Sequence, residues 1–437
     1  MPAGAPLDGG FRTGGVEHER RTGPAARTSR RFGVSDHPPR RRRGADRLEP
    51  GRGHEPDPSG HPDPARGDHP SIGHAHGETG GYGHRFGWDR EFEVYSDFDL
   101  PTYVGPTTYS NLPWITDPDE LRARGVDVAI VGAPFDDMVT HRPGARFGPR
   151  AIREAQYSSG TLNSLQLDVR PFEELVVVDA GDANIVPAYW ERGHAMIYRK
   201  VREVADTGAL PIVLGGDHSI TWPSATAIAE VRRPGAIGIV HFDAHADTAP
   251  DSFGQLAGHG SPMRRLIESG AVRGANFVQV GLRGYWPPPE VLDWMRDQGL
   301  RWHLMTEIEQ RGAEAVVDDA IAEALDGPDA IYLSVDIDVV DPGLAPGTGT
   351  PEPGGLLPRE LLRAIRRVAG RVELAGMDVV EVSPPYDWAE STAMLANRCV
   401  LEAISALAVK RRAGNAVRFA GLIGGGATRA ASRSTRA

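Results

Sequence analysis

The chain contains only one cysteine, Cys399, among its 437 residues. A single cysteine excludes an intramolecular disulfide and a cluster of thiolate metal ligands. The chain also lacks an apolar run of the ~18 residues that a membrane helix requires, and its first residues lack the apolar core of a secretory signal. These absences predict a cytoplasmic protein with no membrane partner, in which any metal is held by histidine and carboxylate side chains.

The composition that is present is that of a globular protein with an acidic body. Hydrophobic residues make up 40% of the chain and charged residues 24%, which allows a full core. The formal charge is -11; residues 1–85 carry 14 Arg and 11 acidic residues, an excess of three positive charges, so the remainder carries -11 - 3 = -14. An acidic body favours small cationic substrates and predicts no nucleic-acid partner.

The first 85 residues differ in composition from the rest. They are rich in Gly, Pro, Arg and His, include eight of the 15 histidines, and show no hydrophobic period of a packed helix or strand. The sequence therefore predicts a disordered extension over 1–85, a folded catalytic domain over 86–412 and a flexible tail over 413–437. Irregularly spaced histidines in such an extension are not expected to form a fixed metal site, because ordering them is costly.

From about residue 100, short β-branched runs alternate with amphipathic stretches. The nearly continuous apolar character of the runs predicts parallel strands covered by helices on both faces, that is, a three-layer α/β/α sandwich with a mainly parallel central sheet. The expected strands are 126–132, 175–179, 210–214, 236–242, 276–280, 330–335 and 373–380, and the expected helices include 189–207, 220–231, 313–325, 358–369 and 393–410. Ligand sites in such sheets lie beyond the carboxyl ends of the strands.

Three of these strand ends carry clustered polar residues. They read Gly-Gly-Asp-His-Ser at 215–219, His-Phe-Asp-Ala-His-Ala-Asp at 241–247 and Ser-Val-Asp-Ile-Asp at 334–338. Residues two apart in an extended segment point to one side, so these segments predict a convergent group of two imidazoles and four carboxylates. The group consists of His218, Asp243, His245, Asp247, Asp336 and Asp338.

The number of carboxylates in this group indicates two metal ions. A single Asp at a strand end is usually a turn former or helix cap, but four unpaired carboxylates in one crevice would repel each other and be costly to desolvate. Two divalent cations neutralise four negative charges. Oxygen and imidazole ligands without sulfur favour manganese or a similar first-row ion.

The chain resembles the ureohydrolase family, which includes agmatinase, arginase and guanidinobutyrase. Besides the three strand-end motifs, the resemblance rests on His-Arg-Pro-Gly-Ala-Arg-Phe-Gly-Pro-Arg at 141–150, Gly-His-Gly-Ser-Pro at 258–262, Ala-Pro-Gly-Thr-Gly-Thr-Pro at 345–351 and Gly-Met-Asp-Val-Val-Glu-Val-Ser-Pro at 376–384. It extends from about residue 100 to residue 412. Several independent motifs in one order are far more specific than any single motif.

The resemblance implies a dinuclear manganese hydrolase with two ions per subunit. One ion would be held by His218, Asp243, Asp247 and Asp336, and the other by Asp243, His245, Asp336 and Asp338, so that Asp243 and Asp336 bridge the ions. A hydroxide between the ions would attack the guanidinium carbon. Asp247 would relay a proton to the leaving amine, Glu381 would bind the guanidinium, and His259 would shuttle protons at the mouth.

Two further histidines, His241 and His141, have less specific predicted roles. His241 matches no ligand of the family, and we expect it to orient a metal ligand through a hydrogen bond. His141 lies in a loop where many members of the family have tyrosine, and we expect it to face the substrate tail.

The resemblance fixes the reaction better than the substrate. Thr248, Ala249 and Pro250 stand where arginases have polar residues, so arginine is disfavoured. We favour agmatine, whose hydrolysis gives putrescine and urea, because Asp251 and the negative charge suit its ammonium. A guanidino acid such as 4-guanidinobutyrate is the alternative, and would use Arg283, Tyr285 or Trp286.

Two rival classes fit the sequence less well. A non-catalytic homologue should have lost a ligand, and a one-zinc deacetylase does not need six. The resemblance also implies a homo-oligomer, either a trimer or a hexamer.

Overall fold

The computed structural model describes residues 103–158 and 162–414. The predicted extension over 1–85 and residues 415–437 of the predicted tail lie outside these ranges, so their expected disorder stays a prediction. The predicted catalytic domain is described from residue 103 onward.

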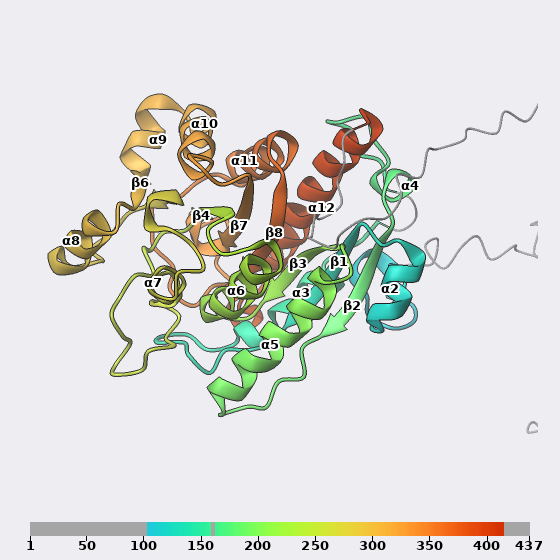
Figure 1. The fold of residues 1–437 in the computed structure, drawn as a ribbon, viewed down its shortest axis with the longest axis horizontal. Helices are drawn as coiled ribbons and strands as arrows, with labels where there is room; N and C mark the ends of the chain where they lie inside the picture. Colours follow the sequence, from blue (N-terminus) through green and yellow to red (C-terminus); the bar gives the residue numbers. More distant parts are fainter. Residues whose placement is uncertain (1–102, 159–161, 415–437) are drawn as a thin grey trace, which may run out of the picture. The chain divides into compact units, whose positions relative to one another are not determined.

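In the described part of the chain, eight strands form one sheet in which every pairing is parallel (Figure 1). Their order is β2-β1-β3-β8-β7-β4-β5-β6. The strands are β1 (Val128–Ala133), β2 (Val177–Asp182), β3 (Leu210–Gly215), β4 (Ile237–Phe242), β5 (Phe277–Leu282), β6 (Arg301–Leu304), β7 (Ala330–Asp336) and β8 (Leu374–Val380). The predicted parallel sheet is confirmed, and each of the seven expected strands overlaps an observed one.

The eighth strand, β6, was not predicted from the sequence. It has only four residues, pairs with β5 alone and lies at the edge of the sheet. Only His303 of its residues is buried, so β6 lacks the continuous apolar run of the interior strands. A short edge strand with exposed positions gives little hydrophobic signal.

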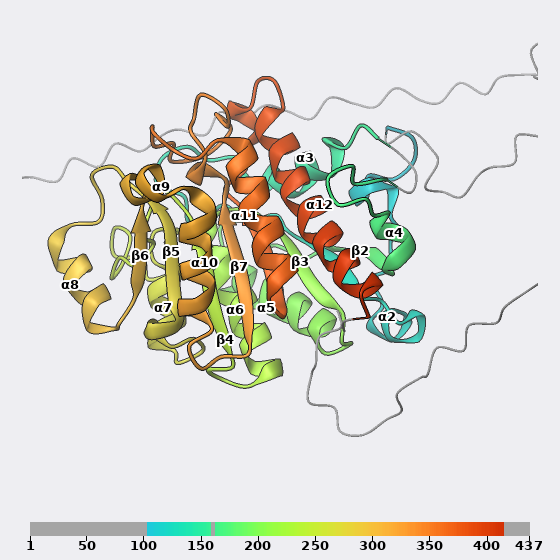
Figure 2. The same ribbon diagram turned by 90° about the horizontal axis from the view of Figure 1, so that it is seen from above.

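Helices cover both faces of the sheet (Figure 2). The core of one face includes residues of α3, α4, α9, α10, α11 and α12, and the core of the other includes residues of α2, α5, α6, α7 and α8. This arrangement confirms the three-layer sandwich. The helices are α2 (Pro118–Arg124), α3 (Gly148–Glu154), α4 (Pro171–Glu174), α5 (Trp190–Ala205), α6 (Thr221–Arg232), α7 (Pro262–Glu268), α8 (Pro289–Asp297), α9 (Met305–Arg311), α10 (Ala313–Ala324), α11 (Pro358–Arg371) and α12 (Ser391–Arg412).

Among the described helices, α12 alone is long and apolar enough to cross a membrane. Most of its apolar side chains are buried, and the helix packs against α11, α4 and α3. Burial of this kind is typical of a core helix, and its apolar character is accounted for by this packing.

The strand order brings the polar strand ends together. Strands β3 and β4 follow each other in the chain, but β8 and β7 lie between them in the sheet. The carboxyl ends of β3, β8, β7 and β4 are therefore consecutive along one edge, at a change in the order of the strands. Parallel α/β sheets place their ligand sites at such a point.

Candidate metal centre

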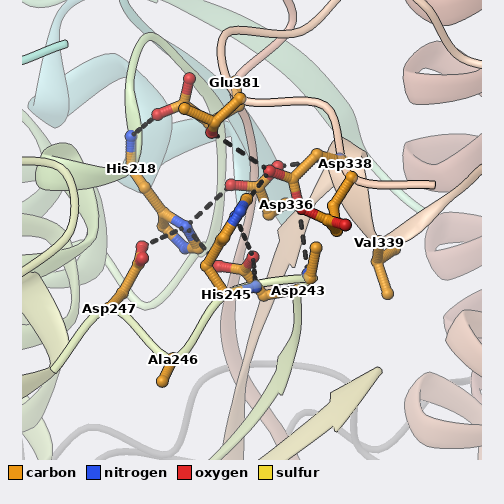
Figure 3. A network of polar contacts seen from close by, with 12 residues as sticks. His218, Asp243, His245, Ala246, Asp247, Asp336, Asp338, Val339 and Glu381 are labelled. Atoms are coloured by element: carbon orange, nitrogen blue, oxygen red, sulfur yellow. Dashed lines mark hydrogen bonds and ion pairs between the residues drawn. The ribbon is translucent and has the colours of Figure 1, made fainter. Parts of the chain in front are cut away.

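The imidazole of His218 lies at the centre of a first cluster of ligand atoms (Figure 3). Its Nδ1 is 3.1 Å from Asp243 Oδ2 and 3.0 Å from both Asp247 Oδ2 and Asp336 Oδ2. Despite these short distances, His218 Nδ1 and Asp243 Oδ2 are buried without an aligned hydrogen bond. Spacings of about 3 Å are those of neighbouring ligands placed about 2.1 Å from one cation at right angles.

A second cluster surrounds His245. Its Nδ1 lies 3.0 Å from Asp338 Oδ2 and 3.5 Å from Asp243 Oδ1. Asp243 thus presents one oxygen to each cluster, but its Oδ1 also accepts the backbone N–H of His245 at 2.6 Å, so its bridging role stays a prediction. Asp336 faces His218 with Oδ2, whereas its Oδ1 accepts the backbone N–H of Asp338 at 2.8 Å, so its place in the second ligand set stays a prediction.

The loops after the strands hold these side chains through backbone hydrogen bonds. The carboxylate of Asp338 accepts the N–H of Ala244 at 3.1 Å, and that of Asp243 accepts the N–H of His245 at 2.6 Å. Two of the predicted catalytic residues, Asp247 and Glu381, have positive φ angles of 53° and 64°. Non-glycine residues adopt this conformation at a cost of about 1–3 kcal/mol, and such strain clusters at functional sites.

The electrostatics of the cluster call for added positive charge. Burial and the charges of Asp338 and Asp243 raise the pKa of Asp336 well above its ordinary value. Burial lowers the pKa of His245, but the carboxylates of Asp338 and Asp243 outweigh it and raise that pKa to about 12. Carboxylates this crowded bind protons strongly when no other cation is near.

The donor set fits a pair of divalent ions. It consists of imidazole nitrogens and carboxylate oxygens, grouped in two neighbouring clusters that share Asp243. Buried polar atoms without hydrogen-bond partners are costly; His218 Nδ1 and Asp243 Oδ2 in the first cluster are such atoms, and a cation there would satisfy them. All six predicted ligands are brought together in this way.

His241 lies in β4, is buried, and contacts this group from within the sheet. Its Nε2 lies 2.9 Å from Asp243 Oδ2, so by distance alone it is a further candidate ligand. The amide nitrogen of Gln279 lies 3.2 Å from His241 Nδ1 and donates to the carbonyl of Ala246. An N–H that faces Nδ1 leaves the ring proton on Nε2. His241 Nε2 and Asp243 Oδ2 nevertheless form no aligned hydrogen bond, so the role of His241 in orienting Asp243 stays a prediction.

Behind His218 lies a polar group that sequence reasoning missed. Ser334 Oγ is 2.9 Å from His218 Nε2 and donates to Asp378 at 2.8 Å. One signal was available, because Ser334 lies two residues before Asp336 and shares its side of the strand. Asp378 gave no comparable signal, since it comes from a different strand, β8.

Glu381 directly follows β8 and is buried, with 1% of its surface exposed. Its Oε1 accepts the backbone N–H of His218 at 2.8 Å and contacts His259 Nδ1 at 2.9 Å. Its Oε2 is buried without a partner. A carboxylate fixed through one oxygen, with the other free, is well placed to accept an N–H group of a guanidinium.

Both ring nitrogens of His259 are engaged. Its Nε2 accepts the backbone N–H of Thr140 at 3.1 Å and lies 2.7 Å from the Thr140 hydroxyl. Burial lowers the pKa of His259 and the Glu381 carboxylate raises it, to about 9. That value favours a charged ring, whereas an Nε2 that accepts the N–H of Thr140 carries no proton, so the contact requires the neutral ring. The proton-shuttle role stays a prediction.

A cavity of about 440 Å³ opens beside the His245 cluster. Its described lining contains the acidic residues Asp247, Asp251 and Asp336 but no Lys or Arg. The lining residues are Thr140, His245, Asp247, Ala249, Asp251, Ser252, Phe253, His259, Gly260, Trp286, Asp336 and Thr350.

The residues predicted to contact a substrate tail are only partly in this cavity. Trp286 lines it, but Tyr285 is fully exposed and His141 is also exposed, and neither lines it. Arg283 is wrongly placed for a carboxylate reader. Its guanidinium donates to the backbone carbonyls of Asp338 and Glu352 at 2.7 and 2.6 Å, so it braces the loop after β7.

Comparison with known proteins identifies the fold and the coarse activity. The arginase family model matches residues 126–405, more than half of the chain. The chain belongs to the arginase family. This result confirms the resemblance and the arginase-like fold, and it makes the protein a ureohydrolase that acts on guanidino compounds.

Three relatives illustrate the similarity. Proclavaminate amidinohydrolase of Streptomyces clavuligerus is 40% identical over 300 residues, which cover 68% of this chain and 93% of that protein; its structure gives a TM-score of 0.64. Mitochondrial agmatinase of Gallus gallus is 38% identical, covering 66% of this chain and 84% of that protein. Trypanosoma cruzi formiminoglutamase, solved with Mn²⁺, is 27% identical with a TM-score of 0.59, covering 65% of this chain and 94% of that one.

Proposed function

We propose that this arginase-family member is an agmatinase that hydrolyses agmatine to putrescine and urea, with two Mn²⁺ ions per subunit. The observation that carries the substrate assignment is the charge of the cavity. Asp251 lines it together with the site carboxylates, and no basic side chain of the described residues does. The ammonium end of agmatine complements such a lining, whereas the carboxylate of a guanidino acid would lack a cationic partner.

Manganese is supported by the chemistry of the ligands and by one relative. Histidine and carboxylate ligands without sulfur suit Mn²⁺ and similar first-row ions, and the T. cruzi formiminoglutamase was solved with Mn²⁺. When bound, two such ions lower the pKa of water toward neutrality and so make a nucleophile available.

The side chains of this site would bind the substrate and move its protons. Glu381 would accept the guanidinium N–H groups through its free Oε2, while Oε1 stays anchored by His218 and His259. Asp247 lines the cavity and is only 5% exposed, so it can pass a proton to the departing amine without exchange with bulk water.

The alternative substrate, 4-guanidinobutyrate, has less support. Its predicted reader Arg283 is occupied with backbone carbonyls. Ala249 lines the cavity where arginases are expected to have polar residues, which also disfavours arginine. We further propose that the enzyme acts in the cytoplasm as a homo-oligomer, a trimer or a hexamer, as the family resemblance implies.

The test is urea release by the manganese-loaded protein with agmatine, 4-guanidinobutyrate, 3-guanidinopropionate, arginine and guanidine. We expect agmatine to have the highest kcat/KM. If a guanidino acid has the highest value, the argument from cavity charge is wrong, although the hydrolytic chemistry stands. If no guanidino compound yields urea, the enzymatic assignment fails.

A further inference from the structure

The ring proton of His218 is placed by a hydroxyl beneath it. Ser334 Oγ lies 2.9 Å from His218 Nε2 and donates its single proton to Asp378 Oδ1 at 2.8 Å. The Ser334 oxygen can therefore only accept from His218, which places the ring proton on Nε2. The other nitrogen, Nδ1, is left bare, and it is the atom that faces Asp243, Asp247 and Asp336.

Asp378 is held in place by two more hydroxyl groups. Tyr332 donates to its Oδ2 at 2.6 Å and Thr221 donates to the same oxygen at 2.7 Å. Ser334 lies directly opposite Asp378 in the pairing of β7 with β8, and Tyr332 lies opposite Gly376. A Cβ at Gly376 would approach the Tyr332 ring to 3.1 Å and Ile228 to 2.4 Å, so glycine makes room for the ring that reaches Asp378.

No ion pair joins Asp378 to a basic side chain of the described residues. The carboxylate is 0% exposed, and within residues 103–158 and 162–414 it is hydrogen-bonded by the three hydroxyls. A buried carboxylate is costly unless positive charge offsets it. Asp378 is linked through Ser334 and His218 to the ligand cluster, where a bound cation would supply positive charge, in the manner of a carboxylate that supports a metal-bound histidine.

We propose that Asp378 is a positioning residue that acts through Ser334 to keep His218 in the tautomer that binds a cation. The inference rests on the proposed two-ion centre and deepens it, because it concerns only the ion at the His218 cluster. His245, in the other cluster, has no contact with Ser334 or Asp378 among the described hydrogen bonds and ion pairs.

The experiment measures Mn²⁺ binding to the full chain by competition with a chelator, which does not depend on a substrate. We expect Ser334→Ala to weaken one of the two bound equivalents by about 10–100-fold, the scale of losing an outer-shell partner, and to leave the other unchanged. Asp378→Asn keeps the side-chain shape and should weaken the same equivalent to a smaller degree. If Ser334→Ala does not fold, as judged by circular dichroism, Asp378→Asn carries the test.

Tyr332→Phe is the matched control, since it removes a buried hydroxyl from Asp378 but keeps the path from Asp378 to His218. It should retain both equivalents at nearly wild-type affinity. Unchanged binding in Asp378→Asn, or equal weakening of both equivalents in all three variants, would overturn the inference and leave the network a purely structural one. A wild-type protein that binds fewer than two ions would instead refute the proposed two-ion centre.

Discussion

The metal centre has two halves, the His218 cluster and the His245 cluster, which differ in burial and in the number of buried side chains that hold the histidine. The side chain of His218 is only 1% exposed and rests on the buried Ser334 and Asp378, whereas that of His245 is 21% exposed and borders the cavity beside Trp286. One half is therefore fixed by the sheet and the other is open to substrate. We expect the ion at the His245 half to exchange more readily, because fewer buried contacts hold its ligands.

Asp243→Asn should remove metal binding from both halves of the centre alike. Asp243 presents one oxygen to each cluster, so losing its charge weakens both. We expect loss of both Mn²⁺ equivalents and of turnover, an effect well beyond the roughly 100-fold that outer-shell changes cause. Metal analysis after gel filtration checks this prediction, and an active variant with two ions would refute the bridging role.

His245→Asn should weaken metal binding at the His245 half and leave the ion at the His218 half in place. We expect this variant to retain one tightly bound ion at the His218 half and to lose about 100-fold or more in kcat. His218→Asn is the matched comparison, and it should in addition lower the thermal midpoint, because the buried Ser334 oxygen loses the N–H that it accepts from His218 while its bond to Asp378 remains. Chelator competition combined with thermal unfolding checks both variants. Retention of two ions in His245→Asn would contradict this assignment.

Glu381→Gln should change substrate binding but not the metal content of either half. Gln keeps an oxygen for the backbone N–H of His218 but loses the charge that would face the guanidinium. Losing one partner of a buried charge pair costs at least about 2 kcal/mol, so kcat/KM should fall by about 30-fold or more. Steady-state kinetics with metal analysis tests this. A loss of bound Mn²⁺ would show that Glu381 supports the ions instead.

Asp251→Asn should slightly weaken substrate binding in the cavity beside the His245 cluster and should leave the metal ligands unchanged. Asp251 is exposed, and an exposed ion pair contributes about 0.2–1 kcal/mol. We expect KM for agmatine to rise by up to about fivefold, with less effect at high salt. A matched series with 4-guanidinobutyrate is the control, because its KM should fall or stay constant. An equal rise for both substrates would argue against a role of Asp251 in charge selection.

The sequence alone predicted the part of the site that lies within single strand ends. The strand-end motifs at 243–247 and 336–338 are local signals, and parallel strand ends meet at one edge, so the convergence of Asp243, His245 and Asp338 could be predicted. The expected extended geometry was wrong, because the chain bends after β4 and forms a 3-10 helix at Ile337–Val339 after β7. The continuous apolar runs likewise predicted the interior strands.

Features that depend on contacts between distant segments could not be predicted in the same way. Asp378 contacts Ser334 across the pairing of β7 with β8, and Thr140 contacts His259 from a loop more than a hundred residues away. Arg283 looked available for a substrate carboxylate, but backbone carbonyls occupy it. A sequence does not show which backbone carbonyls a side chain will contact. The short edge strand β6 was missed for a different reason, because it lacks a hydrophobic pattern.

The most direct test of the dinuclear hydrolase is a titration of the metal-free protein with Mn²⁺, followed by the initial rate of urea release from agmatine. The account predicts that the rate rises and levels off at two equivalents per chain. A rate that levels off at one equivalent, or that does not depend on the metal, would contradict a reaction that requires both clusters.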